Sequence, residues 1–164
     1  MPTSATISSL REHLIEKGLV VHLTGDGEGF SAQMPLKHVR IDFSCNLVEG
    51  TEDTELLQMD GCLPVLVPAD KRLDVLDFSN RINWGLNSGR FVMDPDDGEI
   101  RFRQEIMVQN MTNMLDTVAL HFLHSCRMVD SFFPSLMGLI FRDTPPEEAV
   151  EEGNKQYKTM TSDE

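Results

Sequence analysis

The chain has 164 residues, of which 27 are acidic and 14 are basic, so its formal net charge is −13. We expect it to bind neither nucleic acid nor an anionic membrane surface, because both require clustered Lys and Arg. Hydrophobic residues make up 40%, as in a folded globular chain, and the longest apolar run, residues 136–141, is far shorter than the roughly 20 residues of a membrane-spanning helix.

The cysteines predict a cytoplasmic protein with free thiols. The chain has an odd number of cysteines, and no two of them are close in sequence; they are Cys45, Cys62 and Cys126. The first residues of the sequence lack the basic and apolar segments of a secretory signal. Disulfides persist in oxidising compartments, so this pattern favours a reducing one.

The first half of the chain predicts one helix followed by three strands. Ile7, Leu10 and Leu14 recur at helical spacing, and Gly18 is suited to end that helix. From Val39 onward apolar and polar residues alternate, as in a strand with one buried face. Pro64 lacks the N–H that a sheet ladder uses, so we expect it at an edge or a bulge. The predicted elements are a helix over 6–17 and strands over 19–23, 39–48 and 56–67.

The second half predicts a helix, a hairpin and a long helix. Asp97-Gly98 is a common turn of two-residue hairpins. Pro134 is expected to interrupt the long helix. The polar residues 153–164 are expected to form a disordered tail after a single domain over 1–152. The predicted elements are a helix over 68–87, strands over 90–93 and 99–108, helices over 112–133 and 135–141, and a last helical turn or two from 144.

The predicted order of elements is α-β-β-β-α-β-β-α. Strands joined by short turns pair antiparallel, and each helix must bury an apolar stripe against another element. The sequence therefore predicts an α+β fold, with an antiparallel sheet and helices packed on one of its faces.

The middle helix carries two apolar stripes at helical spacing. A helix of a small domain needs one apolar face for its own core, so a second stripe that ends in a tryptophan predicts a partner or dimer surface. The alternative is a helix that is buried on most of its sides. The first stripe is Val75, Phe78, Ile82 and Leu86, and the second is Leu73, Leu76, Asn80 and Trp84.

The sequence shows no motif for catalysis, a cofactor or a metal. His121 and His124 share a helical face, but Cys126 points about 160° away from His121, so we expect no zinc site. The acidic turn Asp94–Glu99 has its glycine one position too early for a calcium-binding loop. We therefore predict no catalytic residue, cofactor or metal ligand, and the role of this turn stays open.

Five segments in the second half of the chain resemble the YbjN domain family, which has the fold of the type III secretion chaperones. The resemblance implies a bacterial cytoplasmic protein, a chaperone-like or regulatory homodimer with no catalytic motif. The segments are FSNRIN at 78–83, GRFVMD at 89–94, DGEIRFR at 97–103, DSFFPSL at 130–136 and PEEAV at 146–150.

Three functions remain open from the sequence. The first is a non-enzymatic regulatory or chaperone-like module that binds protein and acts as a homodimer. The second is a dedicated secretion chaperone that holds an extended effector segment along apolar surface and sheet edges. The third is an enzyme with a dispersed site around Asp116, His121 and His124.

Overall fold

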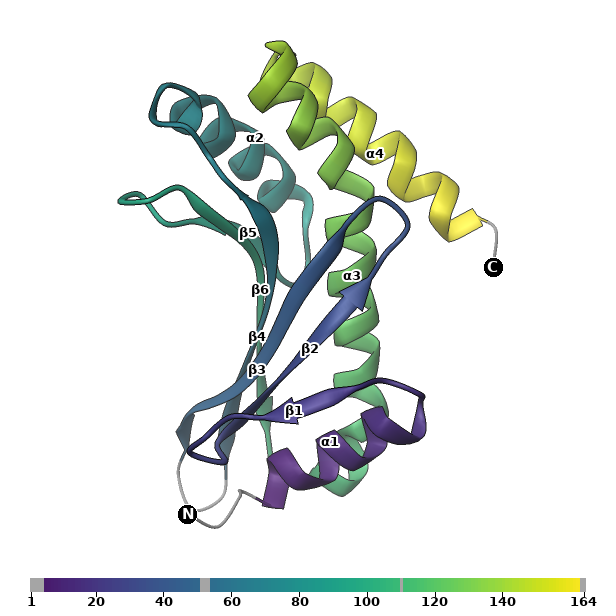
Figure 1. Ribbon diagram of the computed structural model, residues 1–164. Coiled ribbons are helices and arrows are strands. Elements are labelled where there is room, and N and C mark those ends of the chain that lie inside the picture. Colours follow the sequence, from purple (N-terminus) through teal and green to yellow (C-terminus); the bar gives the residue numbers. More distant parts are fainter. Residues whose placement is uncertain (1–4, 51–53, 110, 163–164) are drawn as a thin grey trace.

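A six-stranded antiparallel sheet runs through the part of the chain that the structure describes (Figure 1). This computed structural model describes residues 5–50, 54–109 and 111–162. The strand order is β1-β2-β3-β4-β6-β5, so β1 and β5 form the two edges. The strands are β1 Val21–Leu23, β2 Gly29–Pro35, β3 Arg40–Gly50, β4 Glu55–Leu66, β5 Arg90–Met93 and β6 Glu99–Val108.

The helices of the described chain pack on one face of this sheet, which confirms the predicted α+β fold (Figure 1). Along β6, Ile100, Phe102 and Ile106 are buried toward the helices, while Arg101 and Arg103 project from the opposite, open face. Within the described residues, no helix is long and apolar enough to cross a membrane. The helices are α1 Ala5–Glu16, α2 Arg72–Gly85 after a 3₁₀ turn at Ala69–Lys71, α3 Met111–Arg142 and α4 Pro146–Ser162.

The predicted strands match the sheet closely, except that β2 is missing from the prediction. The hairpin strands β5 and β6 have the predicted bounds. Around Pro64 the pairing of β4 with β6 shifts register between Cys62 and Leu66, which confirms the predicted bulge. The omission of β2 is wrong, because Phe30 and Ala32 face the core and the whole segment pairs with β3. Its short, weakly apolar alternation becomes a strand only through that pairing.

The predicted break of the long helix at Pro134 is also wrong, because α3 is continuous through that residue. Pro134 has no N–H to donate to the carbonyl of Asp130 one turn earlier. The ring Nδ1 of His38, in the β2–β3 turn, lies 3.1 Å from that carbonyl oxygen. The carboxylate of Asp130 accepts the backbone N–H groups of Lys37 at 3.2 Å and His38 at 2.7 Å. A partner from the β2–β3 turn thus compensates for the missing helical bond.

The predicted disordered tail is wrong over residues 153–162, which form the second half of α4. Gly153 is buried, and a Cβ at this position would collide with the ring of Phe132 on α3. Further along, the hydroxyl of Ser131 donates to the sulfur of Met160 at 3.1 Å. The polar composition of the segment hides this packing, because a glycine, rather than a large apolar residue, makes the close contact.

Two apolar clusters share the interface between the helices and the sheet. One joins α1 to the β1 end of the sheet around Phe43, and the other joins α2 and α4 to the β5 end around Phe102. Helix α3 contributes Phe122 to the first cluster and Phe132 to the second. Its length of 32 residues, about 48 Å at 1.5 Å per residue, is what lets it cross both.

Candidate functional site

The second stripe of α2 lies on the surface of the molecule. Trp84 is 92% exposed and Leu73 80%, and Leu76 and Asn80 are exposed as well. On the opposite side of the same helix, Val75, Phe78, Ser79 and Ile82 are buried. The helix therefore has one core face and one separate apolar surface, and the alternative of a helix buried on most sides is wrong.

Charged side chains border the stripe and attach α2 to α4. Arg81 binds the carboxylate of Asp77 through Nε, at 3.0 Å to both oxygens, and reaches Glu147 of α4 through Nη2 at 2.8 Å. All three side chains are well exposed, so the pairs contribute little stability on their own. They give the apolar stripe a polar rim, as in many protein interfaces.

Asn83, on α2, occupies the free edge of β5. Its amide donates to the backbone carbonyl of Phe91 at 2.9 Å, and its side-chain oxygen accepts the Phe91 N–H at 2.8 Å. These backbone groups are the ones that an added strand would use. The β5 edge is thus blocked at its centre, and the opposite edge strand, β1, is only three residues long.

A cavity of about 600 Å³ opens between α2, the loop after it, α3 and α4. Ile82, Met128 and Phe132 give it an apolar floor. His121 and His124 line it together, so the structure brings these two residues to one site.

The hydrogen bonds of His121 fix its neutral tautomer. The amide of Gln104, a residue buried in β6, donates through Nε2 to the backbone carbonyl of His121 at 3.1 Å. The amide oxygen of Gln104 therefore faces His121 Nδ1, at 2.6 Å, and Nδ1 must carry the hydrogen. In the neutral ring, Nε2 is then the nitrogen with the lone pair.

His124 is held among rings and is harder to protonate than a free histidine. Burial lowers its pKa below the ordinary 6.5, and a hydrogen bond to the Ser88 backbone opposes that effect. Its ring lies edge-on to Phe102 of β6, at 6.0 Å, and to Tyr157 of α4, at 6.4 Å. His124 therefore connects the sheet, the α2–β5 loop and α4.

The other residues of the possible dispersed site lie elsewhere. Asp116 does not line the cavity, and its carboxylate lies 3.4 Å from the ring of His13 in α1. Burial raises the pKa of the Cys126 thiol to about 12, so it is neither a good nucleophile nor a good metal ligand. Among the described residues, no three His, Cys, Asp or Glu side chains could hold a metal ion together.

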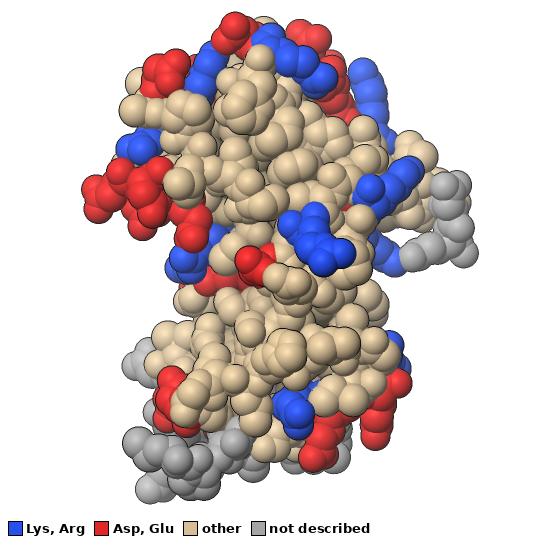
Figure 2. Space-filling view, viewed as in Figure 1, with Lys and Arg blue, Asp and Glu red and all other residues tan. Residues whose placement is uncertain are grey.

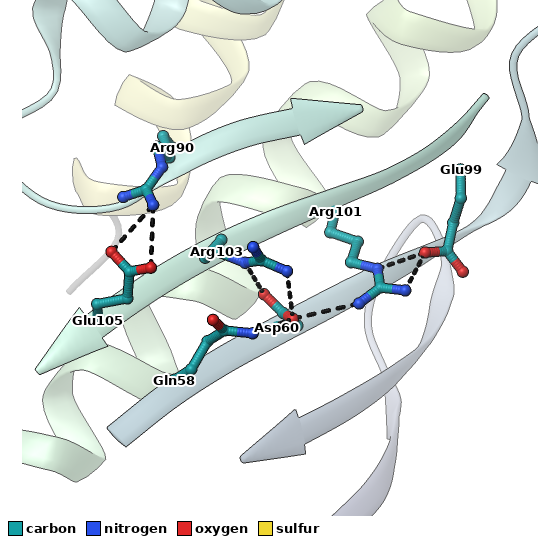
Figure 3. A network of polar contacts seen from close by, with 7 residues as sticks. All are labelled: Gln58, Asp60, Arg90, Glu99, Arg101, Arg103 and Glu105. Atoms are coloured by element: carbon teal, nitrogen blue, oxygen red, sulfur yellow. Dashed lines mark hydrogen bonds and ion pairs between the residues drawn. The ribbon is translucent and has the colours of Figure 1, made fainter. Parts of the chain in front are cut away.

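The open face of the sheet carries a polar network around Asp60 (Figure 3). Its carboxylate accepts from Arg103 Nε at 2.8 Å and Nη2 at 3.0 Å, from Gln58 at 3.0 Å and from Arg101 at 3.3 Å. Arg101 also pairs with Glu99. Asp60 is only 2% exposed although it points away from the helices. The charges of Arg101 and Arg103 are thus balanced by the carboxylates of Asp60 and Glu99.

The acidic hairpin turn is attached to the start of α2. Figure 2 shows acidic side chains gathered at the left, over the tip of the β5–β6 hairpin. Arg72 Nη1 donates to the backbone carbonyl of Pro95 at 2.7 Å, and the Val67 N–H donates to that of Gly98 at 2.8 Å. The carboxylates of Asp94 and Asp97 accept N–H groups within the turn. The structure thus gives these two acids a role in shaping the turn.

Sequence reasoning missed the polar residues that organise this region, of which Gln104 is buried and Asn83 is partly exposed. Asn83 and Gln104 each use a side-chain amide to satisfy backbone groups of another element. Gln104 falls at an inward, otherwise apolar position of the alternating strand β6. A polar residue at such a position is the one signal in the sequence that could have marked it, because buried amides need partners.

Comparison with known protein families finds a match to the larger part of the chain. The model of the YbjN family, described as "putative bacterial sensory transduction regulator", matches residues 6–135. The match runs from α1 into α3 and includes the whole sheet and α2. No curated protein matches the chain.

Proposed function

Because the chain belongs to the YbjN family, we propose that it is a non-enzymatic regulatory module of the bacterial cytoplasm that binds protein and forms a homodimer through the α2 stripe. The family description names a regulator and no reaction. The described cysteines are all free thiols, as expected in a reducing compartment.

The observation that carries the proposal is the exposure of the stripe. Leu73, Leu76 and Trp84 present large apolar side chains to solvent, while the core face of the same helix is already buried. Covering exposed apolar area stabilises an association, and tryptophan is among the residues most often found as hot spots of interfaces.

A two-fold axis fits the spacing of the stripe. Two copies of α2 that cross antiparallel near Leu76 and Asn80 place Trp84 of each copy against Leu73 of the other. The same patch then serves on both copies, as a two-fold interface requires. Asn80, the polar member of the stripe, then lies close to the axis. Its side-chain amide can form a hydrogen bond with Asn80 of the other copy.

The blocked β5 edge favours this mode over the addition of an extended strand. A secretion chaperone that adds an effector strand to a sheet needs free backbone groups. Here Asn83 already binds the N–H and carbonyl of Phe91. A partner protein is better accommodated on the helix surface.

The test replaces Leu73 and Trp84 by Ser together. Because both side chains are exposed in the single folded chain, the double variant should unfold at the same urea concentration as the wild type when both are diluted until they are monomeric. Its dimer should be at least about 30-fold weaker, which corresponds to the roughly 2 kcal/mol of a hot-spot residue. Sedimentation velocity over a range of concentrations measures the dissociation constant.

The matched control is Met107→Ser. Met107 is similarly exposed, but it lies at the far end of β6, away from α2. It should leave the dimer unchanged. A wild type that stays monomeric at every concentration refutes the homodimer, and a double variant as dimeric as the wild type places the interface elsewhere.

A further inference from the structure

The cavity between α2, α3 and α4 is a second site, distinct from the stripe. Its volume of about 600 Å³ lies within the range of pockets that hold small organic molecules. It combines an apolar floor with a few polar groups, among them His121, His124 and Ser88. We propose that this cavity binds an uncharged, mainly apolar small molecule that donates a hydrogen bond to His121 Nε2.

The charges around the cavity favour a neutral ligand. Among the described residues that line it there is no Asp or Glu, although the chain has 27 of them, so an organic cation finds no counter-charge in the wall. Arg81, the one Lys or Arg among the described residues of the lining, is already bound to Asp77 and Glu147. An anion would gain little from it and would approach a protein with a net charge of −13.

The hydrogen bond that Gln104 makes with His121 Nδ1 decides which polar group the ligand needs. Gln104 holds Nδ1 in its N–H form, so the neutral ring accepts through Nε2. Gln104 is itself buried and bonded twice to His121, which keeps the ring from turning over. A hydroxyl or N–H group of the ligand matches this acceptor, whereas an ether or ketone oxygen does not.

Three aromatic probes of similar size separate these requirements. 2-Naphthol is apolar, neutral near pH 7 and has one hydroxyl donor. 2-Methoxynaphthalene lacks the donor, and 2-naphthalenesulfonate carries a negative charge. In equilibrium dialysis, 2-naphthol should bind one molecule per chain, and the methoxy compound roughly 2- to 10-fold more weakly, the range of a net hydrogen bond. The sulfonate should bind most weakly of the three.

Two variants place the binding in this cavity. His121→Asn keeps a side-chain N–H for Gln104 but removes the Nε2 acceptor, so the preference for naphthol over its methyl ether should disappear. Gly85→Phe adds a ring where Gly85 lines the cavity and where a Cβ meets no other atom. It should weaken both neutral probes at least 10-fold. Gly25→Phe, at an equally open position outside the cavity, is its control and should bind as the wild type does.

Three other outcomes would each contradict a part of the proposal: the site, the hydrogen bond to His121 or the neutral charge of the ligand. If 2-naphthol does not bind, or if Gly85→Phe binds it as tightly as Gly25→Phe does, the cavity is not the site. If the methyl ether binds as well as naphthol to the wild type, the hydrogen bond to His121 is refuted. If the sulfonate binds most tightly, the ligand is an anion instead. Because the double stripe variant leaves the cavity intact, it should still bind naphthol even if the dimer is lost.

Discussion

Asp60 is a buried carboxylate on the face of the sheet opposite to the helices. In sequence it shares the even positions of β4 with Gln58 and Cys62, which an alternating strand turns toward water. In the structure its cross-strand partner is Arg103, and the two arginines of β6 cover it. The charge is therefore buried by its neighbours on the sheet rather than by a second layer.

Replacement of Asp60 by Asn should destabilise the protein. The variant keeps the shape of the side chain but removes the charge that balances Arg101 and Arg103. We expect a loss of about 1–3 kcal/mol in the free energy of unfolding, because bonds to a buried charge are strong while the arginines still reach water. Urea unfolding measures it.

The control for that prediction is Glu105→Gln, which removes the charge of the more exposed pair with Arg90 on the same face. Exposed pairs are worth about 1 kcal/mol or less. Equal losses in the free energy of unfolding would mean that the network around Asp60 stabilises the protein no more than an exposed ion pair does.

At the level of elements, α4 is attached to α3 through a contact that needs the absence of a side chain. Gly153 faces the ring of Phe132, and this ring is itself packed against Phe78 and Phe91. The ring is held on its other sides by these two phenylalanines, so the two helices approach this closely only where there is no Cβ. Helix α4 in turn brings Tyr157 to the cavity.

Gly153→Ala should therefore lower stability although alanine favours helix formation. Overpacking of a filled core costs about 1–3 kcal/mol, more than the roughly 1 kcal/mol that alanine gains over glycine in a helix. The midpoint of thermal unfolding should fall by a few degrees. Gly85→Ala, at an open position of α2, should not lower it. An unchanged or higher midpoint for Gly153→Ala would show that α4 is only loosely attached.

At the scale of the whole molecule, net charge opposes the proposed dimer. Each copy carries a formal charge of −13, whereas the residues of the stripe carry none. Association must bring two acidic chains together and is driven by apolar contact. Salt screens the repulsion over distances beyond about 10 Å at 0.1 M.

The dimer should accordingly become tighter as salt increases from about 0.02 M to about 0.3 M. Trp84 is the single tryptophan of the chain, so a change in its emission on dilution reports on the stripe directly. The dimer of the double Ser variant, followed by sedimentation, should stay at least about 30-fold weaker than that of the wild type at every salt concentration. A dimer that weakens with salt would instead point to ion pairs across the interface.

The sequence by itself determined the features that depend on local periodicity. The alternation of β3 and the Asp97-Gly98 turn predict the sheet because side chains two apart share a face. The two stripes of α2 are separate for the same kind of reason, since the helical repeat places Trp84 and Ile82 on different sides. The sequence left open whether the second stripe is buried, and the structure places it on the surface.

Only the tertiary structure decided the features that depend on residues far apart in the chain. Strand β2 exists through its pairing with β3, and the last part of α4 through the space beside Phe132. The cavity requires α2, α3 and α4 to meet, and the tautomer of His121 requires Gln104 from β6. Such contacts are set by strand register and helix packing, which act across the whole chain, so no local pattern of residues contains them.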